Sequence, residues 1–140
     1  MVDVNLLVRS FLLTQSPVIS LLGTNQNGSI YCGFDLPEHF DPDLGPAIQI
    51  FRSGGQSHPE ILPLVNARLE IKVWAAVERA LLAAQVYGAM QDVLHGLTNK
   101  VLDDGEILSA LEVTGPQEWT DPDSGWVTVN SFYAVMARPN

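Results

Sequence analysis

Residues 64–74 fall into two alternating sets of positions. One set of positions is apolar throughout, and the other set carries mostly polar or charged groups: Asn66, Arg68, Glu70, Lys72 and Trp74. A period of two residues is typical of a strand with one buried and one more open face. We therefore predict a strand here, with its charged side facing away from the core.

Directly after this strand, with no turn residue between, residues 75–97 follow a helical period. At 100° per residue, apolar side chains cover this predicted helix except for a narrow strip through Glu78, Gln85 and Asp92. The apolar arc is about twice the width of the stripe on an ordinary surface helix. One sheet cannot cover such an arc, so we expect the first helix and another subunit to cover the remainder.

Apolar residues after an N-cap at Asp3 have helical spacing and predict a first helix that ends near Thr14: Val4, Leu7, Val8, Phe11 and Leu12. Further strands are predicted over residues 30–36, 47–52, 107–114 and 125–138. The glycine-led segment 53–59 is predicted to be a connection outside the sheet interior. This order predicts an α+β fold: a mainly antiparallel sheet of about four to five strands, with an N-terminal helix and one long helix packed on one face.

The chain has 140 residues, which fits one domain with one core. Its single cysteine, Cys32, cannot form an intrachain disulfide, and we interpret it as a small buried residue and not as a reactive thiol. Asp3 and Arg9 interrupt the pattern of a signal peptide, and no run of about 18 uncharged apolar residues suggests a membrane span. We expect a soluble, intracellular protein.

The formal net charge is −9, and the 7 basic residues are scattered singly along the chain. A free-standing nucleic-acid binder normally carries a basic patch, so tight binding of DNA or RNA is not expected. An acidic surface would instead suit a channel through which DNA must pass without sticking, because like charges repel.

The search for chemistry yields little. Gly54-Gly55 lacks the Lys-Ser/Thr of a phosphate-binding loop, and Asp121-x-Asp123 is better explained as a hairpin turn than as a calcium loop. The three histidines (His39, His58 and His95) share no metal-ligand spacing, although His58 could matter at an interface. We predict no catalytic residues, no metal and no cofactor. A hydrolase remains the weakest hypothesis, resting on the four carboxylates Asp35, Glu38, Asp41 and Asp43.

The tryptophans have structural interpretations. Trp74 either packs sideways under a loop of its own chain or anchors a subunit contact, where Trp and Arg are enriched. Trp119 and Trp126 flank the turn predicted at residues 121–125, and we expect them to pair across a hairpin.

The order of these elements and several apolar segments resemble a known family. The segments, in chain order, are VNLLVRSFLLTQSPVISLLG, an Ile-Tyr strand, PAIQIF, ARLEIKVWA and a helix ending in LHGL before a hairpin. Together, from about residue 2 to residue 138, the chain resembles the tail-terminator, or tail-completion, proteins of long-tailed bacteriophages. It lacks the aromatic residue usual before the second strand, and residues 53–64 form a longer segment than usual.

The resemblance implies a single terminator-like domain over residues 1–140 and no enzymatic activity. It implies a hexameric ring that caps the tail tube, stops tube polymerisation and joins the tail to the head–tail connector protein. DNA would pass through the lumen without specific binding. The protein would be assembled in the host cytoplasm and reside in the tail or neck of the virion.

Candidate subunit-interface residues come from the charged strand, its neighbours and the wide helix: Arg52, His58, Arg68, Glu70, Lys72, Trp74, Leu82, Val86 and Val93. An equally simple account of the charged strand face is a solvated surface. The competing hypothesis for function is a small dimeric module that binds a protein or a small ligand without catalysis.

Overall fold

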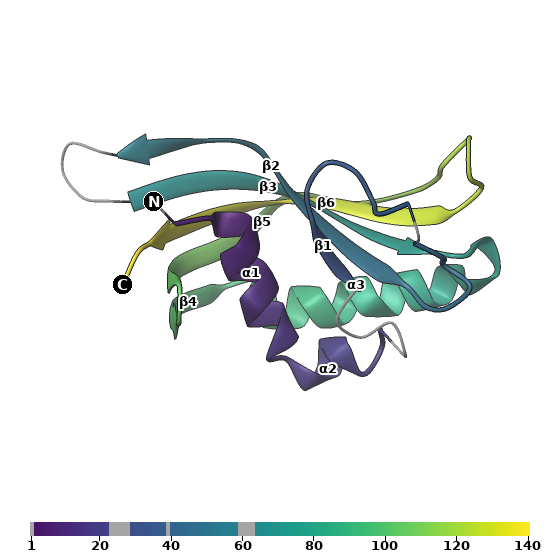
Figure 1. Ribbon diagram of the computed structural model, residues 1–140, viewed down its shortest axis with the longest axis horizontal. Helices are drawn as coiled ribbons and strands as arrows, with labels where there is room; N and C mark the ends of the chain where they lie inside the picture. Colours follow the sequence, from purple (N-terminus) through teal and green to yellow (C-terminus); the bar gives the residue numbers. More distant parts are fainter. Residues whose placement is uncertain (1, 23–28, 39, 59–63) are drawn as a thin grey trace.

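A computed structural model describes the chain except for residues 1, 23–28, 39 and 59–63. Six strands form one twisted sheet in the order β1-β2-β3-β6-β5-β4, and the helices lie on one of its faces (Figure 1). The strands are β1 (Ile30–Cys32), β2 (Ala47–His58), β3 (Leu64–Ala75), β4 (Leu97–Leu102), β5 (Gly105–Thr120) and β6 (Val127–Arg138). Neighbouring strands are antiparallel except β1 and β2, which are parallel.

The helical elements among the described residues are α1 (Val4–Leu13), α2 (Ser16–Ile19), the 3-10 turn η2 (Val77–Arg79) and α3 (Ala80–Leu94). The first helix forms as predicted: the Asp3 side chain caps it by accepting hydrogen bonds from the backbone N–H groups of Asn5 and Leu6, and Thr14 is its C-cap. A second short helix, α2, follows after the extended residue Gln15, and Pro17 lies in its first turn, where its missing N–H is not needed.

Replacing Asp3 with alanine should lower the free energy of unfolding by about 1 kcal/mol, because two N–H groups at the start of α1 lose their acceptor. Chemical denaturation monitored by circular dichroism would measure the change. Asp3→Asn keeps an acceptor and should recover most of the stability. Equal losses in both variants would show that the cap contributes through charge and not through the hydrogen bonds.

The core lies between the helices and the inner face of the sheet. The alternating apolar side chains of β3 point into it as predicted, and all are buried: Val65, Ala67, Leu69, Ile71 and Val73. From the helix side, α3 packs against β3, β5 and β6, while α1 packs across β1 and β2. Burying these side chains supplies the main stabilisation of the fold.

The predicted helix over residues 75–97 is too long at both ends. β3 continues through Ala75, and the α-helix begins only at Ala80 after the turn η2. At the other end, His95 is extended and Gly96 has a φ of 85°, which reverses the chain. The Gly96 N–H then bonds the Ala110 carbonyl at 2.8 Å, so Leu97 belongs to β4, a strand that was not predicted.

The prediction of a connection at residues 53–59 is wrong for residues 53–58, which continue β2 (Pro59 lies outside the described residues). A register shift between Arg52 and Gly54 marks a bulge, and β2 then pairs with β3 as far as His58 opposite Leu64. β1 ends at Cys32 and pairs with β2 only as far as Ile50. Residues 53–58 of β2 therefore have only one partner strand, β3, among the described residues. Glycines and a bulge are compatible with such an edge.

The sheet has one strand more than the upper limit predicted. The strand predicted at residues 30–36 is shorter, ending at Cys32, whereas β5 is longer than predicted and runs to Thr120. β5 bends through register shifts near Glu112 and Thr114. No helix in the described part of the chain is long and apolar enough to cross a bilayer.

Candidate interaction surface on the open sheet face

The face of the sheet turned away from the helices, here called the open face, carries the charged side of β3. Register places Gln49, Lys72 and Asn130 in one row across β2, β3 and β6. The next row contains Phe51, Glu70 and Phe132, and the one after it contains Arg68, Ala134 and Leu111. The sequence correctly predicted that Arg68, Glu70, Lys72 and Trp74 share this face.

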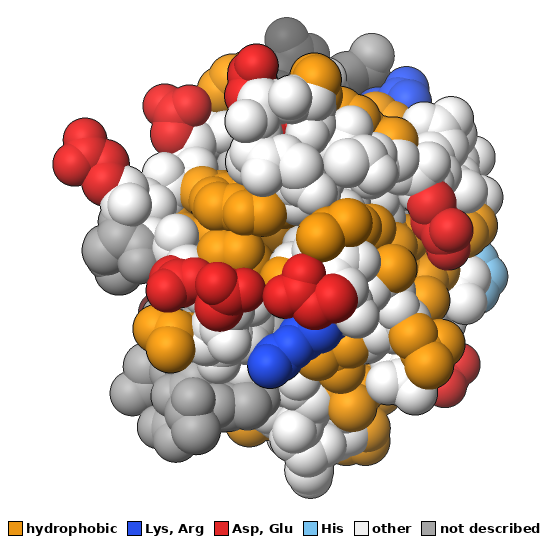
Figure 2. All heavy atoms as spheres, turned by 90° about the vertical axis from the view of Figure 1, so that its right-hand side faces the viewer, with side chains coloured by type: hydrophobic (Ala, Val, Ile, Leu, Met, Phe, Trp, Pro, Cys, Tyr) orange, Lys and Arg blue, Asp and Glu red, His pale blue; other side chains and the backbone are white. Residues whose placement is uncertain are grey.

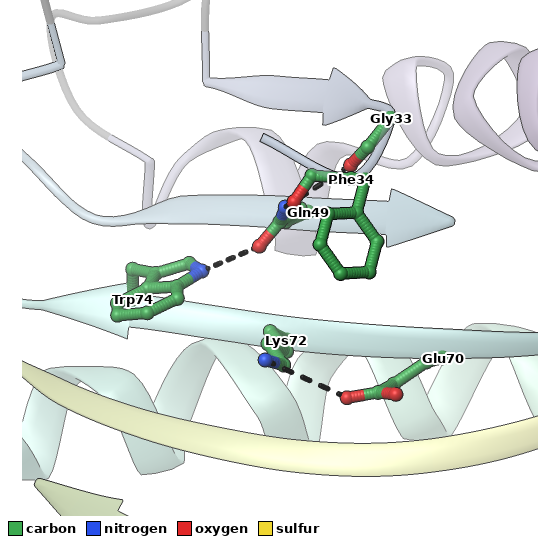
Figure 3. A network of polar contacts seen from close by, with 6 residues as sticks. All are labelled: Gly33, Phe34, Gln49, Glu70, Lys72 and Trp74. Atoms are coloured by element: carbon green, nitrogen blue, oxygen red, sulfur yellow. Dashed lines mark hydrogen bonds and ion pairs between the residues drawn. The ribbon is translucent and has the colours of Figure 1, made fainter. Parts of the chain in front are cut away.

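A buried amide organises one part of the open face (Figure 3). The Gln49 side chain is only 2% exposed, and its Nε2 donates to the carbonyl oxygens of Gly33 and Phe34 at 3.0 and 2.8 Å. Its Oε1 accepts from the indole N–H of Trp74 at 2.9 Å. Every polar atom of this amide is therefore used, and the segment after β1 is tied to β2 and β3.

The same network positions an exposed aromatic ring. Phe34 is 79% exposed, the most exposed of the large hydrophobic side chains described. Its ring meets that of Phe51 edge-on, with centroids 5.4 Å apart. Since Gln49 holds the Phe34 carbonyl, the backbone that carries this ring is fixed on the open face.

Lys72 lies among aromatic rings from three strands. Its Nζ is 5.7 Å from the ring centroid of Phe51 and 5.8 Å from those of Trp74 and Trp119. It also pairs with Glu70 at 3.6 Å (Figure 3). These contacts are of cation–π type. A hollow of about 360 Å³ adjoins them, lined by Phe34, Leu36, Gln49, Phe51, Lys72 and Trp74, among others.

A second hollow, called here the Arg68 hollow, lies further along the open face. Its volume is about 250 Å³, and it is lined mainly by apolar atoms, with Gly55, Ala67, Arg68, Leu111, Ala134 and Met136 among its residues. The Arg68 guanidinium lies 4.6 Å from the centroid of the Phe132 ring. Arg68 is exposed, and no carboxylate in the described part of the chain pairs with it.

The sequence left two alternatives for Trp74, packing under a loop of its own chain or anchoring a subunit contact, and the structure shows the first. Trp74 is 8% exposed and forms a small cluster with Phe40 and Ala47, so its ring packs under the segment between β1 and β2. Trp126 meets the rings of Phe40 and Trp74 edge-on at 5.2 and 6.2 Å. The predicted pairing of Trp126 with Trp119 is therefore replaced: Trp119 lies opposite Thr128 and near Lys72.

The other predicted interface residues lie elsewhere. Val86 is fully buried in the core of its own chain, and Leu82 and Val93 are half-buried against that core on the helix side of the sheet. Burial of Val86 removes it from the surface offered to another subunit. Arg52 is exposed, and its Nε donates to the Gly54 carbonyl at the edge of β2. The backbone of His58 closes β2.

Phe34, Gln49 and Phe51 are among the residues of this surface that sequence reasoning missed. Gln49 is the single polar residue of PAIQIF, between apolar neighbours on both sides. A buried glutamine in such a strand needs hydrogen-bond partners. This need for partners was the signal in the sequence that could have identified Gln49 as part of a polar network.

Among the described residues, the side chains considered for chemistry are not gathered into a metal site or a carboxylate pair with two environments. Asp35, Glu38, Asp41 and Asp43 are all exposed, whereas a carboxylate pair for hydrolysis needs two different environments. Asp121 accepts from both the N–H and the hydroxyl of Ser124, as a turn residue does. No group of three potential metal ligands occurs among the described residues. His39 lies outside them.

The thiol of Cys32 is half-buried in β1, and burial raises its pKa to about 11. At neutral pH such a thiol is almost entirely protonated, and a protonated thiol is a poor nucleophile. This environment agrees with the interpretation of Cys32 as a packing residue.

A second polar network lies on the helix side, where α3 meets β5. Tyr87 donates to the Glu112 carboxylate, which also accepts from Gln91 at 3.3 Å. The Glu112 N–H donates to Nδ1 of His95 at 2.9 Å, so this nitrogen carries no proton. His95 thus connects the end of α3 to the bulged part of β5.

Burial raises the pKa of all three tyrosines, and for Tyr87 and Tyr133 the Glu112 carboxylate raises it further. The folded protein should therefore show little phenolate absorbance at pH values slightly above 10, whereas the chain in concentrated guanidinium chloride should titrate near the ordinary pKa of about 10. Because the unfolded chain loses these protons first, the contribution of the tyrosines to the free energy of unfolding should be constant up to about pH 10 and fall above it. Spectrophotometric titration would measure the phenol midpoints of the folded and unfolded protein, and denaturant titrations at several pH values would measure the free energy of unfolding. A normal phenol midpoint in the folded protein would contradict the expectation.

No protein-family model matches the chain, and no curated protein matches its sequence. Its structure, however, is similar to a solved one, described as the virion of a native gene transfer agent particle. The similarity has a TM-score of 0.68 at 14% sequence identity and covers 94% of this chain and 91% of that chain. Over nearly its whole length, this chain therefore has the fold of a chain from that virion.

Proposed function

We propose that this protein is a structural component of a virion and acts without catalysis. The observation that carries the proposal is the match in fold to a virion chain, which extends over nearly the full length of both chains. Two chains that match end to end share a complete architecture and not only a common motif. The exposure of the carboxylates considered for hydrolysis, and the packing roles of Gln49 and Trp74, agree with a structural protein.

Within this class, we propose the role of tail terminator: a hexameric ring that caps the tail tube, ends its polymerisation and joins the tail to the head connector. The resemblance in the order of the segments supports this role. An aromatic, mixed-charge open face supports it as well, because exposed apolar patches commonly mark protein contacts. A ring requires heterologous contacts, in which two different surfaces of the same chain meet.

The distribution of charge supports a channel for DNA. The segment between β1 and β2 exposes Asp41 and Asp43, Glu78 is exposed in η2 just before α3, and Asp123 is exposed in the β5–β6 turn. Figure 2 shows this end of the molecule, where acidic side chains, with a basic side chain beside them, lie among hydrophobic ones. We propose that acidic groups of this kind line the lumen, where they would keep DNA from binding.

Native mass spectrometry over a range of protein concentrations tests the proposed role. A closed six-membered species, or capped ends when cognate tail tubes are added and imaged by electron microscopy, is expected. An added excess of protein should also stop elongation of tube protein in vitro. A chain that neither forms a ring nor binds tube ends would refute the terminator role.

A small dimeric binding module is the second candidate, and one observation favours it. The hollow of about 360 Å³ beside Lys72 falls within the roughly 300–1,000 Å³ of small-molecule sites. A stable dimer at every concentration, with no binding to tail tubes, would support this function in place of the ring.

A further inference from the structure

Phe34 has the properties of an anchor residue at a protein contact. Its ring is 79% exposed, yet the carbonyl of the same residue is held by the buried Gln49 amide, which in turn binds Trp74. A large aromatic ring on a fixed backbone loses little conformational freedom on binding. Aromatic residues of this kind supply much of the energy of protein interfaces.

The described residues of the same chain do not cover the phenyl ring of Phe34. It touches Phe51 edge-on and borders the hollow beside Lys72 and still remains exposed. Asp35, the next residue, is exposed too. The surface that this pair requires is therefore an apolar recess with a positive charge at its rim.

The Arg68 hollow is a recess of that kind on the same chain. It is lined mainly by apolar atoms, and at about 250 Å³ it is smaller than the roughly 300–1,000 Å³ typical of small-molecule sites. It is suited to a single side chain. The Arg68 guanidinium at its rim rests on Phe132 and has no carboxylate partner in the described part of the chain.

We infer that Phe34 and Asp35 of one copy dock in the Arg68 hollow of a neighbouring copy. The phenyl ring enters the apolar recess, and the Asp35 carboxylate pairs with the Arg68 guanidinium. The inference rests on the proposed function, in which copies of this chain are neighbours in a ring. It assigns the residues that join one subunit to the next. Two different patches of the open face meet in this contact, which makes it heterologous, the kind of contact that a closed ring requires.

Charge reversal tests the pair. Asp35→Arg and Arg68→Glu should each weaken self-association by about tenfold, since each places like charges together. The variant that carries both changes should recover self-association to within about twofold, because the pair is restored in the opposite sense. Asp43→Arg and Arg79→Glu are matched controls: they change the same charges at exposed positions outside the contact and should leave self-association unchanged.

A second set of variants tests the contribution of the Phe34 phenyl ring to the contact. Phe34→Ser should weaken self-association by about tenfold or more, as expected for an anchor residue. Val101→Ser, at a position that is 63% exposed on β4, is the matched control and should have no effect. Circular dichroism and thermal unfolding of each variant exclude loss of the fold as the cause.

Self-association is measured by native mass spectrometry or, if the free chain is monomeric, by the concentration needed to cap tail tubes. Single reversals without effect, or a double variant that fails to recover, would overturn the inference while rings or capped tubes would still support the terminator role. Recovery in a species that is only ever a dimer and leaves tubes uncapped would support the contact and refute the terminator role. A chain that associates with neither itself nor tubes would refute both.

Discussion

Replacing Gly55 with alanine is expected to lower the free energy of unfolding by about 2–4 kcal/mol, through backbone strain and a clash within the sheet. Gly55 has a φ of 121°, which a residue with a Cβ rarely adopts. A Cβ at this position would also overlap the carbonyl oxygen of Asn66 and lie 2.7 Å from the Cα of Ala67. Both neighbours are backbone atoms of β3, so they can move only if the pairing of β2 with β3 shifts.

Gly54→Ala is the matched control. Gly54 also has a positive φ, of 153°, but a Cβ there would meet nothing within 4 Å. It should cost about 1 kcal/mol from backbone strain alone. Denaturant titration of the two variants would separate the clash from the strain. Equal losses would show that β3 accommodates the added Cβ easily, contrary to the expectation.

Replacing Gln49 with leucine is expected to cost about 2–4 kcal/mol, although the substitution makes the strand more apolar. The change removes the acceptor for the Trp74 indole N–H and the donor for the carbonyls of Gly33 and Phe34. A buried polar group left without a partner costs about 1–3 kcal/mol. Chemical denaturation gives the loss, and it should be accompanied by greater mobility of the segment after β1, measured by hydrogen exchange.

A double-mutant cycle with Trp74→Phe sharpens this test. Phenylalanine has no N–H, so Gln49→Leu should cost about 1–2 kcal/mol less in that background than in the wild type. Trp126 packs on Trp74 and serves as a fluorescence reporter of the same cluster. Additive losses would mean that the bond between Trp74 and Gln49 contributes nothing to stability.

The strongest periodic patterns predicted their elements well. The alternation in β3 correctly assigned Ile71 to the core and Lys72 to the open face, because a strand buried on one side imposes a period of two. Asp3 correctly marked the start of α1. In both cases the signal is local, so the sequence around the element is sufficient to predict it.

The ends of α3 could not be predicted in the same way. Leu97 fits the apolar stripe of the helix, yet it lies in β4, because Gly96 turns the chain and bonds Ala110 on β5. That pairing depends on a strand far along the sequence. Similarly, Gly54 and Gly55 predicted a break in β2, whereas pairing with β3 and a bulge accommodate them.

The open face was half predicted. Arg68, Glu70 and Lys72 were found from the pattern of one strand, but their neighbours Phe51, Phe132 and Trp119 come from three other strands. Register across the sheet brings these residues together, and a single sequence does not contain that register. Val86 was predicted at an interface because the helix has a wide apolar arc. The width of the arc indicates how much apolar surface must be covered, but not whether the same chain or another subunit covers it.

The two ends of the chain lie at the same end of the molecule (Figure 1). A Cβ on Gly105 would be 3.0 Å from Val2 and 2.8 Å from the Arg138 carbonyl, so the first and last described segments meet at the start of β5. A small density marker fused to either terminus would therefore label the same pole of the subunit. In electron micrographs of capped tubes, such a marker would reveal the polarity of the subunit along the tail axis.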